Sequence, residues 1–252
     1  GSNWSNFTKS IIMKKLEVFG AAKLKGQVKI SGSKNASLPI LAATLLSDKR
    51  ISLTNIPRVK DVETMIKLLE SMGSKVKVLK NKNSLIIKND KIIKAEASYD
   101  LMSTMRAGII VLGPLLARFG KARASIPGGC NLGFRPIDIH LEALKKMGVK
   151  YKLVDGYINA KAKNGLVGAK IKFPKISVGA TENLMIAACL AKGQTVLSNC
   201  AIEPEIKDLS NFLCSIGAKI VWTGRRQVKI IGIKTFKQSN YKIMFDRIEA
   251  GT

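Results

Sequence analysis

The chain contains few of the residues that bind structural metals or form disulfide scaffolds. Among its 252 residues there are four cysteines and a single histidine, His140, and no two cysteines form a Cys-x-x-Cys pair. A structural zinc site needs about four Cys or His ligands at short spacings, so we expect no metal and no cofactor. Scattered cysteines are also too few for a disulfide scaffold, which indicates a reducing, cytoplasmic environment.

Long apolar runs and aromatic side chains are also scarce. No apolar run reaches the roughly 18 residues that a membrane-spanning helix requires, so we expect no membrane insertion. Aromatic residues make up 6% of the chain, too few for the stacking surfaces that bind single-stranded nucleic acids. Residues 1–12, before Met13, lack the apolar core of a signal peptide, and we interpret them as an added leader.

Acidic residues are outnumbered by basic ones. The chain has 17 Asp and Glu against 43 Lys and Arg, a formal net charge of +26. A basic nucleic-acid-binding protein is therefore one alternative, because Lys and Arg release counterions from phosphates. The basic residues are mostly lysines spread along the chain, which favours a solvated lysine-rich surface and no nucleic-acid partner. A positive field would also attract small anionic substrates.

A unit of secondary structure repeats along the chain. Three segments each show an acidic residue, an amphipathic helix with apolar residues at i, i+3, i+4 and i+7, a glycine and two short strands. A glycine suits the left-handed residue that ends a helix. The acidic residues expected to cap or begin these helices are Asp61, Asp138 and Asp208, and the closing glycines are Gly73, Gly148 and Gly217.

Another apolar helix and a short strand precede each of these segments. We expect the helices at 36–46, 104–119 and 181–191, the strands at 51–53, 122–125 and 195–198, and hairpins at 75–88, 150–161 and 219–231. Turns are expected at Asp155-Gly156 and Gly224-Arg225. One unit is thus helix–strand–helix–strand–strand with a strand leading in. Three copies should close around a shared core, because one copy cannot bury its own apolar faces.

Two segments of this repeat resemble the enolpyruvyl transferase family. They are Gly32-Ser33-Lys34-Asn35-Ala36 and the glycine-rich loop 127–136, Pro-Gly-Gly-Cys-Asn-Leu-Gly-Phe-Arg-Pro. The similarity runs from about Lys15 to Thr252 and departs from the family at Ala250, where threonine is usual. It implies an α/β fold, an inside-out α/β barrel of the EPT/RTPC-like type with three strand–helix–strand–helix–strand–strand units.

The resemblance also implies how the chain is divided. Residues 13–33 would enter a second domain, 34–241 would form a complete three-repeat domain, and 242–252 would cross back. Chains of this family are much longer, so we expect most of the second domain to be missing. The resemblance makes that domain the expected partner, the source of the general base, and the reason why this polypeptide alone would be inactive.

The implied reaction transfers the enolpyruvyl group of phosphoenolpyruvate to the 3′-hydroxyl of UDP-N-acetylglucosamine, releases phosphate, and serves peptidoglycan synthesis. An alternative acceptor is the shikimate phosphate used by the sister enzyme 5-enolpyruvylshikimate-3-phosphate synthase, which lacks a cysteine in the loop. Addition followed by elimination needs an acid, a base and several cations.

The resemblance assigns three catalytic residues. Cys130 would be the acid, because a free thiol with a pKa of about 8.5 keeps its proton near neutrality and the glycine-rich loop can fold over a ligand. Lys34 and Arg135 would hold the carboxylate and phosphate of phosphoenolpyruvate. The other cysteines are interpreted as small buried hydrophobic residues: Cys189, Cys200 and Cys214.

Further residues are implied to bind the UDP-sugar. Asn35 would lie at the reacting hydroxyl, and Arg106 needs an anionic partner because it lies in an apolar helix. The nucleotide-binding segments would be 135–139 and 175–178, and they add the following residues to the site: Pro136, Ile137, Asp138, Ile139, Lys175, Ile176, Ser177 and Val178. His140 is interpreted as a satisfied polar residue rather than a catalytic group, and Glu203 and Glu205 as anchors in the cleft.

Overall fold

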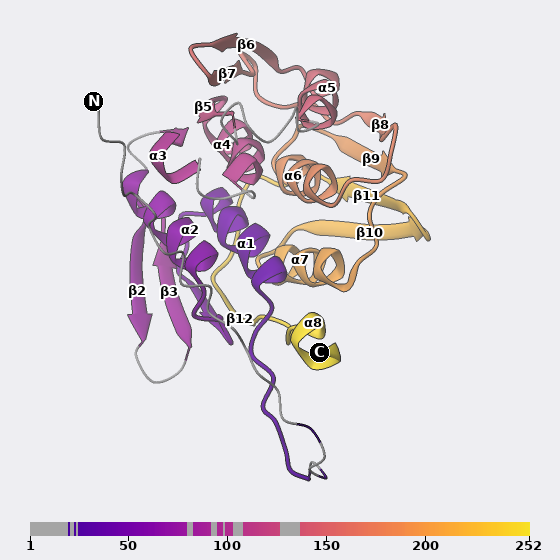
Figure 1. Ribbon diagram of the computed structural model, residues 1–252. Coiled ribbons are helices and arrows are strands. Elements are labelled where there is room, and N and C mark those ends of the chain that lie inside the picture. Colours follow the sequence, from indigo (N-terminus) through magenta and orange to yellow (C-terminus); the bar gives the residue numbers. More distant parts are fainter. Residues whose placement is uncertain are drawn as a thin grey trace, which may run out of the picture.

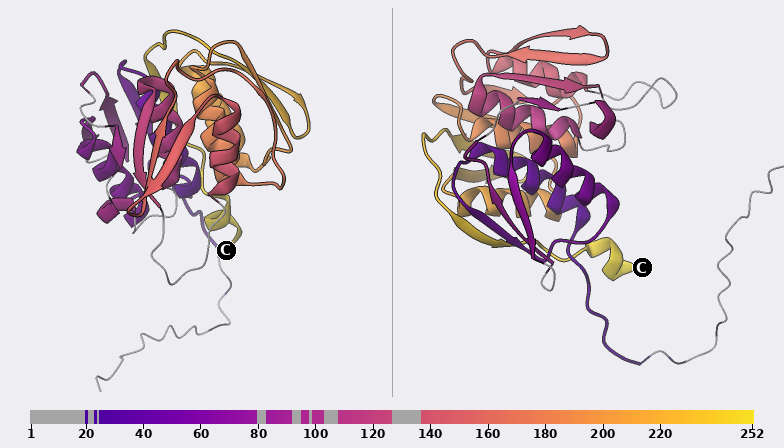
Figure 2. Two further views of the ribbon diagram at one scale, coloured as in Figure 1. Left: turned by 90° about the horizontal axis from the view of Figure 1, so that it is seen from above. Right: turned by 90° about the vertical axis from the view of Figure 1, so that its left-hand side faces the viewer.

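The computed structural model describes residues 20, 23, 25–79, 83–91, 95–97, 99–102, 108–126 and 137–252. The helices gather in the middle of the molecule and the strands surround them (Figure 1). The turned views in Figure 2 show the same arrangement from above and from the side. The fold is therefore a mixed α/β fold with its sheets on the outside, as the resemblance to the enolpyruvyl transferases implies.

Helices and strands are interspersed along the described chain. The helices are α1 (Lys34–Ala43), α2 (Lys60–Ser71), α3 (Tyr99–Met102), α4 (Leu112–Phe119), α5 (Asp138–Lys146), α6 (Val178–Ala188), α7 (Pro204–Ser215) and α8 (Arg247–Gly251), with 3-10 turns η1 (Thr44–Leu46) and η2 (Gly108–Val111). The strands are β1 (Ile51–Thr54), β2 (Lys75–Leu79), β3 (Ser84–Lys88), β4 (Glu96–Ala97), β5 (Lys121–Ser125), β6 (Lys150–Val154), β7 (Tyr157–Lys161), β8 (Lys170–Lys172), β9 (Gln194–Ser198), β10 (Lys219–Gly224), β11 (Gln227–Ile231) and β12 (Ser239–Lys242).

One strand order is common to the three four-stranded sheets of the described residues. The sheets run β12-β1-β3-β2, β4-β5-β7-β6 and β8-β9-β11-β10. In each sheet the first strand pairs parallel with the second, and the remaining pairs are antiparallel. The leading strand that the repeat predicts is β4 in the second unit and β8 in the third. In the first unit no strand precedes α1 among the described residues, and β12 takes that place in the sheet. Because β12 comes from the end of the chain and completes the sheet of the first unit, the three units close into a ring.

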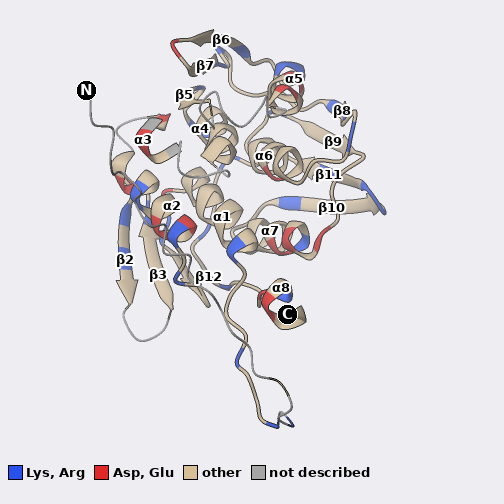
Figure 3. Cartoon of the chain, viewed as in Figure 1, with Lys and Arg blue, Asp and Glu red and all other residues tan. Residues whose placement is uncertain are grey.

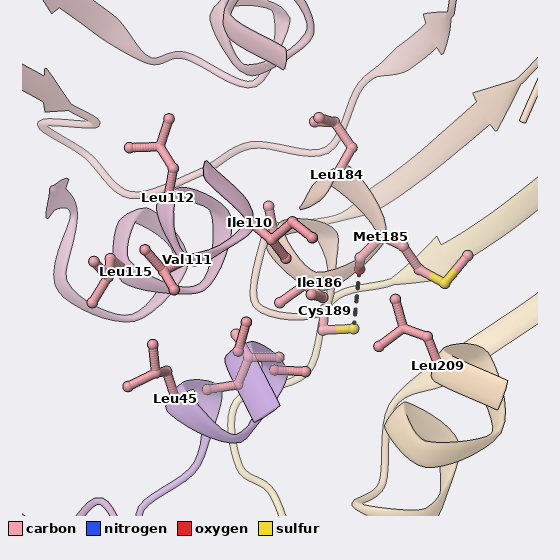
Figure 4. Close-up of a cluster of buried hydrophobic side chains, with 14 of the residues drawn as sticks. Leu45, Ile110, Val111, Leu112, Leu115, Leu184, Met185, Ile186, Cys189 and Leu209 are labelled. Carbon is pink, nitrogen blue, oxygen red and sulfur yellow. Dashed lines mark hydrogen bonds between the residues drawn. The ribbon is translucent and has the colours of Figure 1, made fainter. Parts of the chain in front are cut away.

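The core lies where α1, α4, α6 and α7 contact one another. Helix α6 is buried on all sides from Ala180 to Ala188, a stretch that is apolar apart from Thr181, Glu182 and Asn183. Figure 4 shows part of this core, in which the Cys189 thiol donates to the Met185 carbonyl at 3.3 Å. Cys189 and Cys200 are buried as predicted, whereas Cys214 is exposed because it lies on the outer side of α7.

The predicted turns are largely found. Gly73, Gly148 and Gly217 have φ of 109°, 91° and 109°, the left-handed conformation expected after a helix. Asp155 and Gly156 also have positive φ, of 51° and 74°, and form the tight turn between β6 and β7. The third hairpin turns at residues 225–226, one residue later than predicted, because β10 extends to Gly224 through a shift of register.

The boundaries of several helices differ from prediction. Predicted helix 36–46 is α1 followed by η1, and the described part of 104–119 is η2 followed by α4. Helix α6 begins at Val178, three residues before the predicted start, because Ser177 caps it.

The prediction that three aspartates cap or begin the amphipathic helices is correct only for the start of α5. Val59 and Ile137 occupy the caps of α2 and α5 without a side-chain hydrogen bond, so Asp61 and Asp138 lie in first turns instead. Asp208 lies inside α7, which begins earlier at a proline. Its carboxylate accepts from the Tyr241 hydroxyl at 2.6 Å and the Met244 amide at 3.1 Å, and so fastens β12 to the helix.

Charge is distributed over the surface. Lys and Arg lie on strands of all three sheets (Figure 3). None of the described helices has the length and apolar character needed to cross a membrane.

Candidate functional site

The N-terminal ends of three long helices meet at one pocket of about 190 Å³, which we call the acceptor pocket. Asn35 from the first turn of α1, Val178 from the first turn of α6 and Glu203 at the cap of α7 line it. The remaining lining residues are Leu38, Pro39, Ile110, Glu182, Glu205 and Arg247. Helix N-termini carry partial positive charge and unpaired N–H groups, so their convergence favours polar or anionic ligands.

The sequence Gly32-Ser33-Lys34-Asn35 places two predicted residues at the start of α1. A Cβ on Gly32 would lie 1.6 Å from the Asn55 carbonyl oxygen, so only glycine allows this approach. Ser33 is extended, and its hydroxyl accepts from the Ala36 amide at 3.2 Å, which caps the helix. Lys34 and Asn35 therefore occupy the first turn.

Ser177 performs the same task at α6. Its hydroxyl accepts from the Ala180 amide at 3.2 Å, so the helix begins at Val178. The structure thus brings two predicted site residues, Asn35 and Val178, to one pocket from segments more than a hundred residues apart in the chain.

Lys34 is held by an ion pair. Its ammonium nitrogen lies 3.1 Å from Asp61 Oδ2 on α2, and the two side chains are 42% and 37% exposed. An exposed pair of this kind contributes little stability and exchanges readily with another anion. Lys34 is therefore available to an anionic ligand that competes with Asp61.

Three carboxylates of the acceptor pocket, Glu182, Glu203 and Glu205, form what we call the carboxylate cluster. Glu205 is 4% exposed, and its Oε1 accepts from Arg247 Nε at 2.9 Å. The Oε2 atoms of Glu203 and Glu205 are buried and have no hydrogen-bond partner among the described residues. Buried oxygens without donors are costly unless a ligand or water supplies them.

Glu182 is the member of this cluster on α6 and, like Glu205, is 4% exposed. Burial, and then the charges of Glu205 and Glu203, raise the pKa of Glu182 well above its ordinary value. Glu182 is not among the site residues predicted from the sequence. A charged residue inside an apolar helix was the available signal, the same signal that drew attention to Arg106.

A second pocket, of about 150 Å³, lies between α5 and the chain that precedes α6; we call it the α5 pocket. Asp138 and Ile139 line it from α5, and Lys172, Phe173 and Pro174 line it from the other side. The pocket reaches the chain only as far as Pro174, directly before the predicted segment 175–178. The contact of α5 with α6 brings that segment near the predicted residues 137–139.

Most of the predicted residues near these pockets are accessible. Asp138, Lys175 and Ile176 are exposed, Ile137 and Ser177 are partly buried, and only Ile139 is buried at 7% exposure. Ile139 is therefore mainly a packing residue that also forms the pocket wall.

Several predicted site residues lie outside the described residues. They are Arg106, Cys130, Arg135 and Pro136. The described chain on either side of the glycine-rich loop ends at Ile126 and resumes at Ile137, directly before α5. The roles predicted for these residues stay predictions.

Comparisons with known proteins agree on one family. A family model described as EPSP synthase (3-phosphoshikimate 1-carboxyvinyltransferase) matches residues 18–252. Proteins named UDP-N-acetylglucosamine 1-carboxyvinyltransferase from Pelagibacter ubique and Trichlorobacter lovleyi are 69% and 50% identical over 240 residues, which are 95% of this chain. The chain spans 57% of the length of each of these relatives.

Solved structures share the fold. The enolpyruvyl transferase NikO from Streptomyces tendae superposes with a TM-score of 0.80 at 20% identity, over 92% of this chain and 54% of that one. An EPSP synthase from Acinetobacter baumannii gives a TM-score of 0.69 at 15% identity, over 86% of this chain and 49% of that one.

Proposed function

The chain belongs to the EPSP synthase family of enolpyruvyl transferases, and on that premise we propose that it transfers the enolpyruvyl group of phosphoenolpyruvate to the 3′-hydroxyl of UDP-N-acetylglucosamine, releasing phosphate. The observation that carries the proposal is the convergence of Asn35 and Val178 on one pocket. The names of the relatives at 69% and 50% identity support the choice of acceptor and a place in peptidoglycan synthesis.

The donor site in this proposal lies at the start of α1. Lys34 would bind phosphoenolpyruvate as a point charge, helped by the N-terminal end of its helix and in competition with Asp61. Arg135 would bind the same anion bidentately, and Cys130 would protonate its C3 carbon during addition. We assign no general base to this chain.

The acceptor site in this proposal is the acceptor pocket together with the α5 pocket. Glu203 and Glu205 offer buried oxygens that lack donors among the described residues, which suits sugar hydroxyl and amide groups better than a phosphate. Asn35 would bind the reacting hydroxyl. Ile137, Asp138 and the segment 175–178 would bind the nucleotide, with the exposed Lys175 near its diphosphate. Arg106 and Pro136 complete the proposed set.

The division of the chain follows from the same proposal. Residues 34–241 would form the three-repeat domain, and residues 13–33 and 242–252 would connect it to a second domain, the proposed partner. Both substrates are metabolites of the cytoplasm, which is the proposed location.

Titration of the 252-residue chain with three ligands tests the proposal. We expect UDP-N-acetylglucosamine to bind and shikimate 3-phosphate and duplex DNA not to compete, as followed by calorimetry and NMR. Binding of shikimate 3-phosphate instead would transfer the assignment to the sister activity. Salt-dependent DNA binding that the UDP-sugar leaves unchanged would favour the nucleic-acid alternative.

A further inference from the structure

His140 is a buried side chain that the proposed reaction does not use. It lies in the first turn of α5, is 6% exposed, and directly follows the pocket residues Asp138 and Ile139. Its ring faces α6. A Cβ built on Gly179 would lie 3.4 Å from His140 Cε1 and 3.6 Å from Nε2, so the ring packs against the backbone of the first turn of α6.

Asn183 on α6 completes this contact. Its Oδ1 accepts from the Gly113 amide at 2.7 Å, and a backbone amide can only donate, which fixes the orientation of the side-chain amide. Asn183 Nδ2 therefore faces the Ile109 carbonyl at 3.3 Å and His140 Nδ1 at 3.0 Å. Because Nδ2 is a donor, Nδ1 must be the acceptor, and the imidazole is neutral with its proton on Nε2.

The environment agrees with this tautomer. Burial lowers the pKa of His140 to about 4, so the ring stays neutral across the physiological range. A second proton, on Nδ1, would point at the side-chain N–H of Asn183, so two donors would face and repel each other. The pair therefore acts as a fixed link among α4, α5 and α6 rather than as a proton donor or acceptor.

We propose that His140, held by Asn183, is a positioning residue that sets the spacing between the segments 137–139 and 175–178 and so the affinity for a uridine diphosphate group. The inference rests on the proposed function, because the nucleotide role of both segments comes from it. Neither side chain need touch the ligand. The first turn of α5 lines the α5 pocket and the first turn of α6 lines the acceptor pocket, so a shift of one helix against the other would change both.

Two substitutions of His140 distinguish the effect of its hydrogen bond from the effect of its side-chain volume. His140→Leu keeps much of the ring volume but removes the acceptor, whereas His140→Asn can place its Oδ1 near the position of Nδ1. We expect the affinity of the chain for UDP and UDP-N-acetylglucosamine, measured by calorimetry, to fall about tenfold in His140→Leu and to recover to within about threefold in His140→Asn. Thermal unfolding is recorded for each variant.

Asn89→Leu is the matched control. Asn89 is buried, and its side-chain amide donates to the Thr44 carbonyl at 2.7 Å, on the first unit rather than between α5 and α6. We expect this variant to lose stability and keep its affinity for UDP. If Asn89→Leu and His140→Leu lost affinity for UDP equally, general destabilisation would explain the loss, and the inference would be overturned.

The tautomer offers an independent readout, because His140 is the only histidine of the chain. A ¹⁵N-edited NMR spectrum near neutral pH should show one neutral ring protonated at Nε2, and an Nδ1–H tautomer or a cation would overturn the inference. A wild-type chain that binds neither UDP nor UDP-N-acetylglucosamine would overturn the proposed function and this inference with it. A wild type that binds both, with His140→Leu binding equally well, would overturn the inference alone.

Discussion

Two buried polar groups at the helix starts of this molecule differ in how well they are satisfied. The His140–Asn183 pair uses one side-chain amide to contact α4, α5 and η2, and each of these three contacts matches a donor with an acceptor. The carboxylate cluster instead leaves Glu203 Oε2 and Glu205 Oε2 without donors among the described residues. A satisfied buried network holds helices in place, whereas an unsatisfied one is where a ligand or water is expected to bind.

The largest expected effect comes from breaking the satisfied network. Asn183→Leu would leave the Gly113 amide without its acceptor and the Ile109 carbonyl without its donor, both inside the core. We expect a loss of about 3–5 kcal/mol in the free energy of unfolding, measured by urea denaturation. Asn89→Leu, which removes the hydrogen bond from the Asn89 side chain to the Thr44 carbonyl, should lose about 1–2 kcal/mol. Equal losses in the two variants would contradict the prediction that Asn183 contributes more to stability than Asn89.

A smaller effect is expected from the ion pair between Arg247 and Glu205 of the carboxylate cluster. Arg247→Leu removes the guanidinium that lies 2.9 Å from Glu205, whose side chain is 5% exposed, while that of Arg247 is 45% exposed. We expect a loss of about 2 kcal/mol in the free energy of unfolding, because a buried carboxylate loses its cation. Arg225→Leu, at an exposed turn, is the control and should change stability by less than about 0.5 kcal/mol. An unchanged free energy of unfolding in Arg247→Leu would show that solvent already screens the charge of Glu205.

Glu182→Gln should raise the free energy of unfolding, whereas the substitutions above lower it. Since the folded-state pKa of Glu182 is raised above its ordinary 4.5, its ionisation weakens the fold as the pH rises past that value. Gln removes this cost, so we expect the variant to be more stable than the wild type by on the order of 1 kcal/mol at pH 8. The advantage should vanish as the pH falls toward 4, where Glu182 is protonated in both states. Urea titrations at several pH values measure this difference. A variant less stable than the wild type at pH 8 would contradict the raised pKa of Glu182.

The smallest change in stability is expected at the partly exposed ion pair of Lys34 and Asp61. Asp61→Asn removes the partner of Lys34, and the free energy of unfolding should change by less than about 0.5 kcal/mol because both side chains are partly exposed. The affinity for phosphoenolpyruvate should rise at the same time, since the anion no longer competes with Asp61. Equilibrium binding in low salt measures this. Weaker binding would mean that Asp61 orients Lys34 instead of competing for it.

Much of the fold was predictable because local patterns express it. The glycines after the amphipathic helices and the Asp155-Gly156 turn follow from backbone conformations that few other residues adopt. The amphipathic helix before Gly73 and the hairpin after it follow from the spacing of apolar residues. Helix starts were less predictable, because aspartates such as Asp208 find partners on other elements instead of capping.

The site was predictable only in part. Lys34, Asn35 and Val178 were found through short motifs that resemble the family, and two of them meet at the acceptor pocket. Glu182 was missed because it lies in an apolar helix, where spacing alone suggests core. Its significance depends on Glu203 and Glu205, which reach it from another helix.

The sequence by itself determined the repeated unit, because hydrophobic spacing and turn residues act over a few neighbouring positions. It also determined which residue types stand at the helix starts, since Ser33 and Ser177 cap through atoms only three residues away. Only the tertiary structure decided that β12 completes the first sheet, that three helix starts share a pocket, and that Asn183 fixes the tautomer of His140. Those contacts join distant parts of the chain, and their energies depend on burial, which no short stretch of sequence specifies.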